Sequence, residues 1–263
     1  VNNKSLKLIK DPKRILDLPK GFTYKIVSEF ETQMNDGLQV PDHADGMGCF
    51  KGEKDQIILI RNHELTHSQQ YKFKQGHKKS AFANIDNIFK AYNKDSIYDS
   101  CIDGTVCFGG TTTIVYNIKK HIVENEYLSL AGTLINCSGG ITPWNTWITC
   151  EETVATKDNF LLKDHGYNFE VSPNIKTNSP IPLKTMGRFR HEAVAFDLKS
   201  GAVYQTEDQR DGMIYRFLPT NKTNLIKGGK LQGLAFLDQP NLDTRNWNNK
   251  TVEKNKLYQV KWI

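Results

Sequence analysis

The stretch Met186-Gly-Arg-Phe-Arg-His-Glu-Ala-Val-Ala-Phe-Asp-Leu-Lys-Ser-Gly-Ala-Val-Tyr-Gln-Thr-Glu-Asp208 predicts two strands joined by a tight turn. Its centre, Asp197-Leu-Lys-Ser-Gly201, is typical of a turn, because Asp can accept hydrogen bonds from the following backbone and Gly tolerates a positive φ. An antiparallel hairpin places the start of one strand beside the end of the other. Five ionisable or metal-coordinating side chains therefore meet at one end of this hairpin. They are Arg190, His191, Glu192, Glu207 and Asp208.

The same arrangement recurs at two other predicted strand ends. The strand at 56–60 runs into Arg61-Asn-His-Glu64, and the strand at 144–149 runs into Cys150-Glu-Glu152. Like charges repel one another unless a cation lies among them. Each cluster alone is typical of a solvated loop, but three in the same position favour a metal centre, with Arg190 as an additional cation.

The whole chain predicts an all-β protein. Hairpins recur along it, few segments have helical periodicity, and the turns are rich in Asp, Asn, Lys and Gly. A β-propeller is the preferred architecture, because its blades place equivalent strand ends around one central mouth. A β-sandwich would explain the strands but not the repeated position of the acidic residues.

The predicted organisation is an N-terminal arm at 1–17 and one β-propeller domain at 18–263. A polar stretch at about 65–104 reads as an insertion, with a short helix at 81–92. The Gly-rich stretch 131–144 could bind phosphate through backbone N–H groups or form a tight crossover between sheets, and the sequence leaves both open.

Composition excludes some classes of protein. The 263 residues are 38% hydrophobic, and no segment is apolar for long enough to cross a membrane. The net charge of +6 is spread over predicted loops, which gives little support for nucleic-acid binding. The five cysteines form no Cys-x-x-Cys pair, so a structural zinc site is not expected.

Several motifs together resemble the PhoX-type alkaline phosphatases and their uncharacterised secreted relatives, from about residue 18 to the end. The motifs are Leu18-Pro-x-Gly-Phe22, Asp45-Gly-Met47, Arg61-Asn-His-Glu64, Gly110-Thr-Thr-Thr113, Thr133 to Cys137, Pro143-Trp-x-Thr-Trp147, Cys150-Glu-Glu152, His191-Glu-Ala193 and Tyr204-x-Thr-Glu-Asp208. The resemblance implies a six-bladed propeller that is exported, hence periplasmic or secreted. It also implies hydrolysis of phosphate monoesters at a centre of Fe³⁺ and Ca²⁺.

The resemblance also assigns roles to individual residues. Arg190 is expected to contact phosphate and Glu192 to bind metal, together with Glu151 or Glu152. His191 could support this site or pack within a blade. The further metal candidates are Asp45, Glu64, Glu207, Asp208 and, as the cysteine ligand, Cys49.

Residue chemistry independently favours hard cations. Carboxylate oxygens suit calcium, magnesium or Fe³⁺, and the absence of clustered histidines argues against zinc. Arginine can bind two phosphate oxygens at once, so phosphate-ester small molecules are the expected substrates.

The last residue is Ile263, and the hairpins suffice for about four blades. We therefore expect this chain to cover part of the ring. A catalytically inactive, calcium-stabilised propeller that serves as a binding module is the alternative function. A propeller lactonase is a third, for which one calcium site would suffice and the acidic clusters are in excess.

Overall fold

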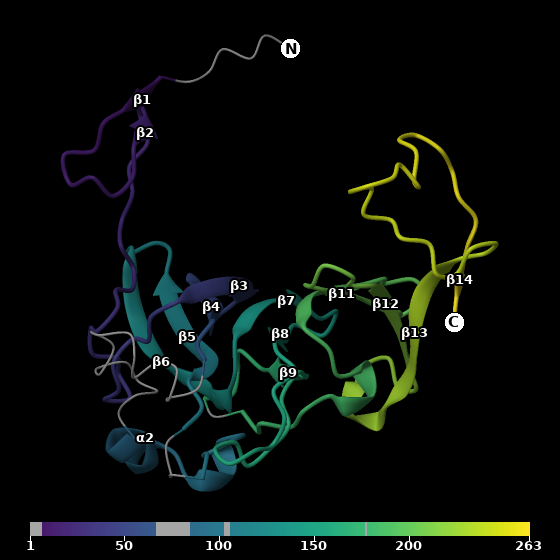
Figure 1. Ribbon diagram of the computed structural model, residues 1–263. Helices are drawn as coiled ribbons and strands as arrows, with labels where there is room; N and C mark the ends of the chain where they lie inside the picture. Colours follow the sequence, from purple (N-terminus) through teal and green to yellow (C-terminus); the bar gives the residue numbers. More distant parts are fainter. Residues whose placement is uncertain (1–6, 67–84, 103–105, 177) are drawn as a thin grey trace.

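The computed structural model describes residues 7–66, 85–102, 106–176 and 178–263, and regular structure in these residues is almost entirely β (Figure 1). This confirms the all-β prediction. The described helical segments are short. They are α2 (Ile85–Ala91), η2 (Lys94–Ser96), η3 (Lys184–Met186) and η4 (Leu225–Lys227). None of the described helices has the length and apolar character needed to cross a membrane.

Three antiparallel sheets carry most of the chain, and each is built from strands that are consecutive in sequence. The first sheet contains β3 (Ala44–Lys51), β4 (Gln56–His63), β5 (Gly109–Asn117) and β6 (Ile122–Thr133). The second contains β7 (Asn136–Ile141), β8 (Trp147–Glu151) and β9 (Asn168–Val171). The third contains β10 (His191–Phe196), β11 (Val203–Glu207), β12 (Ile214–Pro219), β13 (Gly229–Phe236) and β14 (Val260–Trp262).

Each sheet is an up-and-down meander, as the blades of a propeller are. The first strands of the three sheets, β3, β7 and β10, lie next to one another, with β7 between the other two. The three sheets follow one another along an open arc (Figure 1). The described residues thus have blade-like sheets around a shared side, without forming a closed ring.

The hairpin within residues 186–208, called the decisive hairpin below, forms where the sequence predicts it. Strands β10 and β11 pair from His191↔Glu207 to Phe196↔Val203. The Asp197 carboxylate accepts a hydrogen bond from the Lys199 N–H at 3.0 Å, and Gly201 has a φ of 78°. The turn is therefore closed by the aspartate side chain and the left-handed glycine that its sequence provides.

Apolar side chains fill the spaces between neighbouring sheets. Phe50 and Ile60 of the first sheet pack with Trp147 and Phe169 of the second. Between the second and third sheets, a further cluster contains Ile148, Val194, Val203 and Phe217. The second sheet therefore packs against both of its neighbours, and the sheets stack side by side with the inner strands β3, β7 and β10 next to one another.

Glycines let these inner strands approach backbone to backbone. A Cβ atom at Gly46 of β3 would lie 2.7 Å from the Ser138 Cα atom of β7. A Cβ atom at Gly140 of β7 would lie 2.1 Å from the Val194 carbonyl oxygen of β10. No larger residue fits either position without movement of the neighbouring strand, so these glycines set the separation of the inner strands.

The predicted arm and insertion have these positions in the structure. Strands β1 (Leu8–Ile9) and β2 (Leu18–Pro19) pair in a hairpin at one end of the arc (Figure 1). Helix α2 lies within the predicted helical stretch 81–92, of which 81–84 fall outside the described residues. Ile88, Tyr92 and Ile97 pack with Leu128 of β6, so the described part of the predicted insertion contributes to the core.

Candidate metal centre

The three sheets repeat one local geometry at the same end. In each, the first residue of the inner strand pairs with the last residue of the second strand. These pairs are Ala44↔His63, Asn136↔Glu151 and His191↔Glu207. In each sheet the register is irregular directly after this pair. The irregularity interrupts strand alternation and allows the next inner-strand residue to turn toward the shared end.

A repeated hydrogen bond closes each of these ends. The residue after the second strand donates its backbone N–H to the carbonyl oxygen of the residue before the inner strand. The three bonds run from Glu64 to His43 at 2.8 Å, from Glu152 to Ile135 at 2.9 Å and from Asp208 to Arg190 at 3.0 Å. Each sheet therefore presents two adjacent side chains at equivalent positions. The pairs are Asp45 with Glu64, Cys137 with Glu152, and Glu192 with Asp208.

Three of these side chains form a compact group of potential metal ligands. The Sγ atom of Cys137 and one carboxylate oxygen each of Glu152 and Glu192 all lie within 4.8 Å of one another. Cys137 is buried, whereas Glu152 and Glu192 are half-buried. Ligand atoms bind a cation at roughly 2.0–2.6 Å, so one ion can contact all three after small side-chain rotations.

The other three side chains act on the same group electrostatically. Burial, followed by the charges of Asp208, Glu192 and Glu64, raises the pKa of Glu152 to about 7. The pKa of Glu64 is raised by burial and by the hydrogen-bonded Asp45 carboxyl. Carboxylates from all three sheets thus repel one another across a shared space, which makes this space favourable for cations.

The same repulsion extends to Glu192 and to the cysteine. Burial and the charges of Asp208 and Asp45 raise the pKa of Glu192. Burial, together with Cys150 and Glu192, raises the pKa of the Cys137 thiol. A metal ion reverses both effects, because it replaces the protons and stabilises the carboxylate and thiolate forms.

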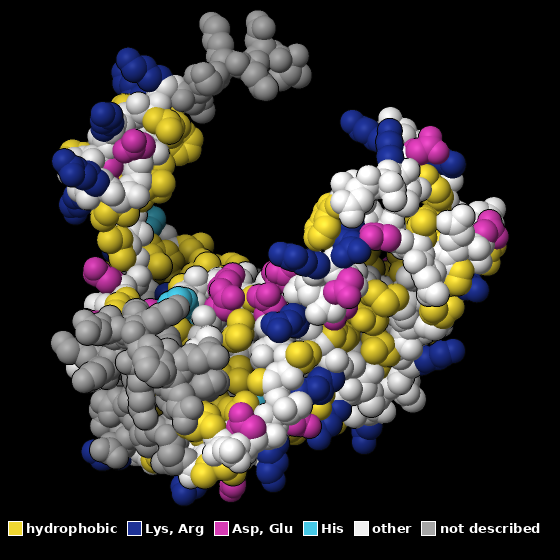
Figure 2. Space-filling view, viewed as in Figure 1, with side chains coloured by type: hydrophobic (Ala, Val, Ile, Leu, Met, Phe, Trp, Pro, Cys, Tyr) yellow, Lys and Arg dark blue, Asp and Glu magenta, His cyan; other side chains and the backbone are white. Residues whose placement is uncertain are grey.

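Arg190 lies at the edge of the acidic group, by which we mean the carboxylates of Asp45, Glu64, Glu152, Glu192 and Asp208. It is half-buried, and its Nη1 atom is 3.5 Å from the Glu152 carbonyl oxygen. Figure 2 shows that Asp and Glu side chains gather near the middle of the arc with Lys and Arg side chains beside them. An anion that approaches the acidic group therefore needs bound cations, and Arg190 is placed to assist them.

Two predicted ligands, Glu151 and Glu207, have other partners. Glu151 is fully buried and accepts hydrogen bonds from the backbone N–H groups of Leu134, Gly166 and Tyr167 at 2.9, 2.8 and 3.1 Å. Glu207 accepts hydrogen bonds from the Met213 N–H and the Tyr215 hydroxyl, both at 3.1 Å. The two carboxylates lie at strand positions that alternate with those of Glu152 and Asp208, so they are directed elsewhere.

His191 and Cys49 also lie apart from the compact group. His191 is buried, its ring packs on Phe189 with centroids 3.7 Å apart, and its Nε2 atom is 3.3 Å from the Gly187 carbonyl oxygen. Burial lowers the pKa of His191 to about 3, so the ring is neutral at physiological pH. Cys49 is exposed on β3 opposite Leu59 and belongs to no three-residue ligand group among the described residues.

In the motif 61–64, only the glutamate reaches the acidic group. Arg61 bonds to Thr112 and forms an ion pair with Glu126 at 3.2 Å. His63 is buried, with its ring nitrogens 2.8 Å from the Asp42 carbonyl oxygen and 2.8 Å from the Thr112 hydroxyl. The arginine and histidine therefore hold the first sheet together and position Glu64.

Sequence reasoning did not identify Cys137 as the cysteine of this group. The available signal was its position two residues after Ile135, which corresponds to that of Glu192 after Arg190 in the decisive hairpin. Sequence reasoning also missed the buried partners of Glu151. His165 lies between two acids, with Nδ1 2.7 Å from Glu151 and Nε2 3.4 Å from Asp99. Because His165 is distant from both acids in sequence, no local pattern indicated that these three side chains would meet.

Comparison with solved structures shows that the fold is similar to that of a known protein. The chain is similar to Pseudomonas fluorescens PhoX, solved in complex with vanadate, a transition state analogue, with a TM-score of 0.50 and 18% sequence identity. The similarity covers 76% of this chain and 46% of that chain, so the present chain spans less than half of its structural neighbour. Comparison with curated proteins gave no match.

Family comparison supplies the assignment. Residues 4–263, almost the whole chain, match the family described as alkaline phosphatase PhoX. The match includes all three sheets and the six side chains at their shared end, Asp45, Glu64, Cys137, Glu152, Glu192 and Asp208. The chain therefore belongs to the PhoX alkaline phosphatase family.

Proposed function

We propose that the protein hydrolyses phosphate monoesters at a metal centre formed by Cys137, Glu152 and Glu192. The observation that carries this proposal is that these three ligand atoms, two from the second sheet and one from the third, lie within 4.8 Å of one another beside Arg190. Membership of the PhoX alkaline phosphatase family supports the reaction type. Asp45, Glu64 and Asp208 complete the acidic group, from the equivalent positions of the same sheets.

The donor set fits the cations that the family implies. Carboxylate oxygens are hard ligands and suit Ca²⁺ and Fe³⁺, and a thiolate is a good ligand for iron. The raised pKa values of Glu152, Glu192 and Cys137 show how unfavourable this group is without a cation. We infer that Cys137, Glu152 and Glu192 bind iron, and that Asp45, Glu64 and Asp208 take part in binding calcium.

The residues of this chain divide the work as follows. When bound by Cys137, Glu152 and Glu192 and their acidic neighbours, cations would neutralise phosphate oxygens and would supply an activated water. Arg190 binds the phosphate through its planar guanidinium group and holds it against the cations. The Glu152 carbonyl oxygen orients that guanidinium by accepting its Nη1 hydrogen bond. His191 stays neutral and buried, so it positions the start of β10 and leaves proton transfer to other groups.

We further propose that the three blade-like sheets form part of a six-bladed propeller and that the protein is exported to the periplasm or secreted. The repeated end geometry of the sheets supports the first point, because rotation about a shared axis generates such a repeat. Family membership supports the second.

Metal analysis and an arginine substitution test the proposed function. The longest form of the protein that the gene encodes should contain iron and calcium and hydrolyse p-nitrophenyl phosphate. Arg190→Lys keeps the charge but loses the planar fork, so kcat/KM should fall and inhibition by inorganic phosphate should weaken. We expect kcat/KM and the affinity for inorganic phosphate each to fall by about one to two powers of ten, equivalent to roughly 1.5–3 kcal/mol. The metal content should be unchanged.

Arg188→Lys is the matched control. Arg188 lies two residues away and donates to the backbone carbonyl oxygens of His165, Val154 and Ala155, so it has a structural role. This variant should keep wild-type phosphate inhibition. Calcium without iron and without hydrolysis would instead support the calcium-stabilised binding module. Wild-type phosphate affinity in Arg190→Lys would overturn the role of Arg190.

A further inference from the structure

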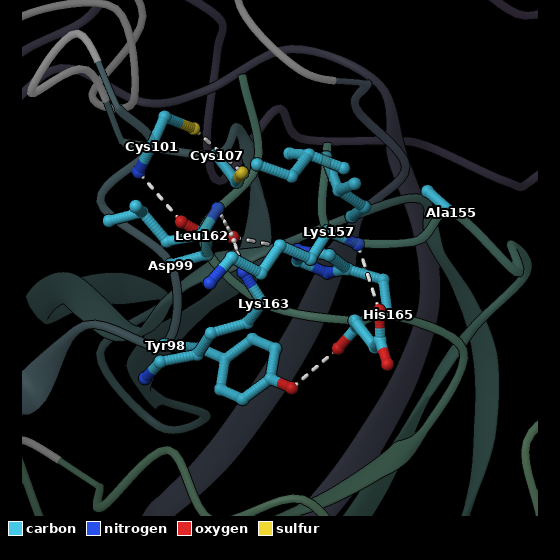
Figure 3. Close-up of polar contacts among 12 residues, drawn as sticks. Tyr98, Asp99, Cys101, Cys107, Ala155, Lys157, Leu162, Lys163 and His165 are labelled. Atoms are coloured by element: carbon cyan, nitrogen blue, oxygen red, sulfur yellow. Dashed lines mark hydrogen bonds and ion pairs between the residues drawn. The ribbon is translucent and has the colours of Figure 1, made fainter. Parts of the chain in front are cut away.

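Two cysteine thiols lie in direct contact in a buried part of the molecule, apart from the Cys137 group. The Sγ atoms of Cys101 and Cys107 are 3.0 Å apart. Cys101 is 2% exposed and Cys107 is fully buried. Figure 3 shows the two sulfur atoms pointing toward each other beside Asp99. The proposed phosphatase reaction uses neither thiol.

A single residue positions both cysteines. The Asp99 carboxylate accepts a hydrogen bond from the Cys101 N–H at 2.7 Å, and the Asp99 carbonyl oxygen accepts one from the Cys107 N–H at 3.1 Å. Asp99 itself is held against β6 by its own N–H, which donates to Gly132. Cys101 has a φ of 53°, a conformation that persists only where surrounding contacts enforce it. The meeting of the thiols is therefore built into the backbone.

The surroundings favour an uncharged sulfur pair. Contact with Cys101, burial and the nearby charges of Asp99 and Glu151 all raise the pKa of the Cys107 thiol. A thiolate is thus disfavoured here, and with it a role as a nucleophile. A disulfide is uncharged, so the same surroundings accept it without penalty.

A metal ion is a poorer occupant of this position, although Asp99, Cys101 and Cys107 lie close enough to bind one. The oxygens of Asp99 already accept hydrogen bonds from several donors. Besides Cys101, these are the backbone N–H groups of Leu162 and Lys163 at 3.0 and 2.9 Å and the His165 ring at 3.4 Å. Metal binding would have to break part of this network.

We propose that Cys101 and Cys107 form an intramolecular disulfide bond in the oxidising compartment that the exported protein reaches. The sulfur atoms need to approach by only about 1 Å to reach a bond length of roughly 2.0 Å. The oxidant is the disulfide of a thiol–disulfide exchange partner. Two protein thiols and one donor disulfide give one protein disulfide and two donor thiols. The two electrons and both protons pass to the donor.

The bond would stabilise the buried network that lies next to the proposed metal centre. Asp99 contacts His165, His165 contacts Glu151, and Glu151 directly precedes Glu152 at the end of β8. Both cysteines follow Asp99 and donate their backbone N–H groups to it, so a disulfide between them limits the opening of this network. Oxidation should therefore raise thermal stability without changing the composition of the metal centre.

Peptide mass analysis tests the proposal directly. Both cysteines fall in one tryptic peptide, residues 95–119, which contains no other cysteine. The purified protein is equilibrated with oxidised and reduced glutathione, denatured with an alkylating agent and digested. We expect the peptide to be unalkylated and lighter than the dithiol form by two hydrogen atoms. Prior reduction should give the doubly alkylated peptide.

Thermal denaturation gives a second readout. The oxidised wild-type protein should melt on the order of 5 °C above the reduced one, and this difference should vanish in the double variant Cys101→Ala/Cys107→Ala. In Cys107→Ala alone, Cys101 should be fully alkylated. If the variants do not fold, the wild-type mass measurement still decides. Complete alkylation of both cysteines after oxidation, a glutathione adduct on either, or bound zinc lost in the double variant would overturn the proposal.

Discussion

Glu151 and Glu152 are neighbours in sequence, yet their carboxylates belong to two opposite kinds of environment. Glu151 lies in a buried network with His165 and Asp99, in which every carboxylate accepts hydrogen bonds from several donors. Glu152 lies among Glu64, Glu192 and Asp208, where other carboxylates are its neighbours. The strand alternation at the end of β8 separates the two environments.

The pKa shifts of the two regions differ accordingly. In the buried network, burial opposes the charged forms. The two carboxylates outweigh it and raise the pKa of His165 to about 9, and hydrogen bonds from His165 and backbone groups lower the pKa of Asp99. In the acidic group, burial and repulsion act together and raise the pKa of Glu152 to about 7. Buried acids with several donors stabilise the fold, whereas acids that repel one another form a place that favours an external cation.

The largest expected effect separates the neighbouring glutamates by stability. Glu151→Ala removes the acceptor for three backbone N–H groups and leaves the His165 charge without its closest partner. Loss of one partner from such a buried group destabilises by about 3–5 kcal/mol. Urea unfolding of the metal-free protein should show this loss or a failure to fold. Glu152→Ala serves as control and should unfold close to the wild type; equal losses in both variants would contradict the distinction.

The next prediction uses pH to separate the two regions. The pKa of His165 is raised from 6.5 to about 9, so its stabilising contribution is complete below pH 6.5 and is lost as pH rises through 9. The pKa of Glu152 is also raised, so its contribution is lost in a lower window, from pH 4.5 through 7. Unfolding free energies of the metal-free protein should fall in both windows. His165→Gln should remove the upper slope, and Glu152→Gln should reduce the lower one, to which the raised pKa values of Glu64 and Glu192 also contribute.

A third prediction concerns the cation itself. Glu192→Gln keeps the size of the side chain but removes a charged ligand, which should weaken iron binding on the order of tenfold to hundredfold, about 1.4–2.8 kcal/mol. Because binding to the native state stabilises it by mass action, melting temperature should fall in the metal-loaded protein. With a chelator present, the variant should melt no lower than the wild type, because the loss of the Glu192 charge relieves repulsion from Asp208 and Asp45. Unchanged iron content in the variant would assign Glu192 a structural role.

The smallest expected effect has the opposite sign. Glu152→Gln in the metal-free protein at pH 8 relieves repulsion from Asp208 and Glu192. The group is partly solvated, so the gain in stability should stay below about 1 kcal/mol. Addition of iron and calcium should reverse the order and make the wild type more stable. A variant that is less stable than the wild type under both conditions would show that Glu152 has local partners of its own.

The sequence predicted the strands, the hairpin turn and the presence of an acidic mouth. Alternation and turn chemistry are local signals, and Asp197 and Gly201 form the expected turn. Sequence reasoning named Cys49 rather than Cys137 as the candidate cysteine, and it left open the choice between Glu151 and Glu152. Both choices depend on register irregularities and on hydrogen bonds between residues that are far apart in the chain, such as His165 with Asp99. A one-residue change of register exchanges the two faces of a strand.

The glycines of the inner strands have a consequence for ionic selectivity. The proposed metal ligands come from more than one sheet, so the distance between ligands of neighbouring sheets depends on how closely the sheet backbones approach, and Gly46 and Gly140 set that approach. We therefore expect the centre to discriminate cations by ionic radius through positions that have no side chain at all. Gly46→Ala should shift preference from calcium toward the larger strontium ion, with every ligand intact. Competition binding that leaves the ratio of the two affinities unchanged would show that side-chain rotation, rather than backbone spacing, determines which ion fits.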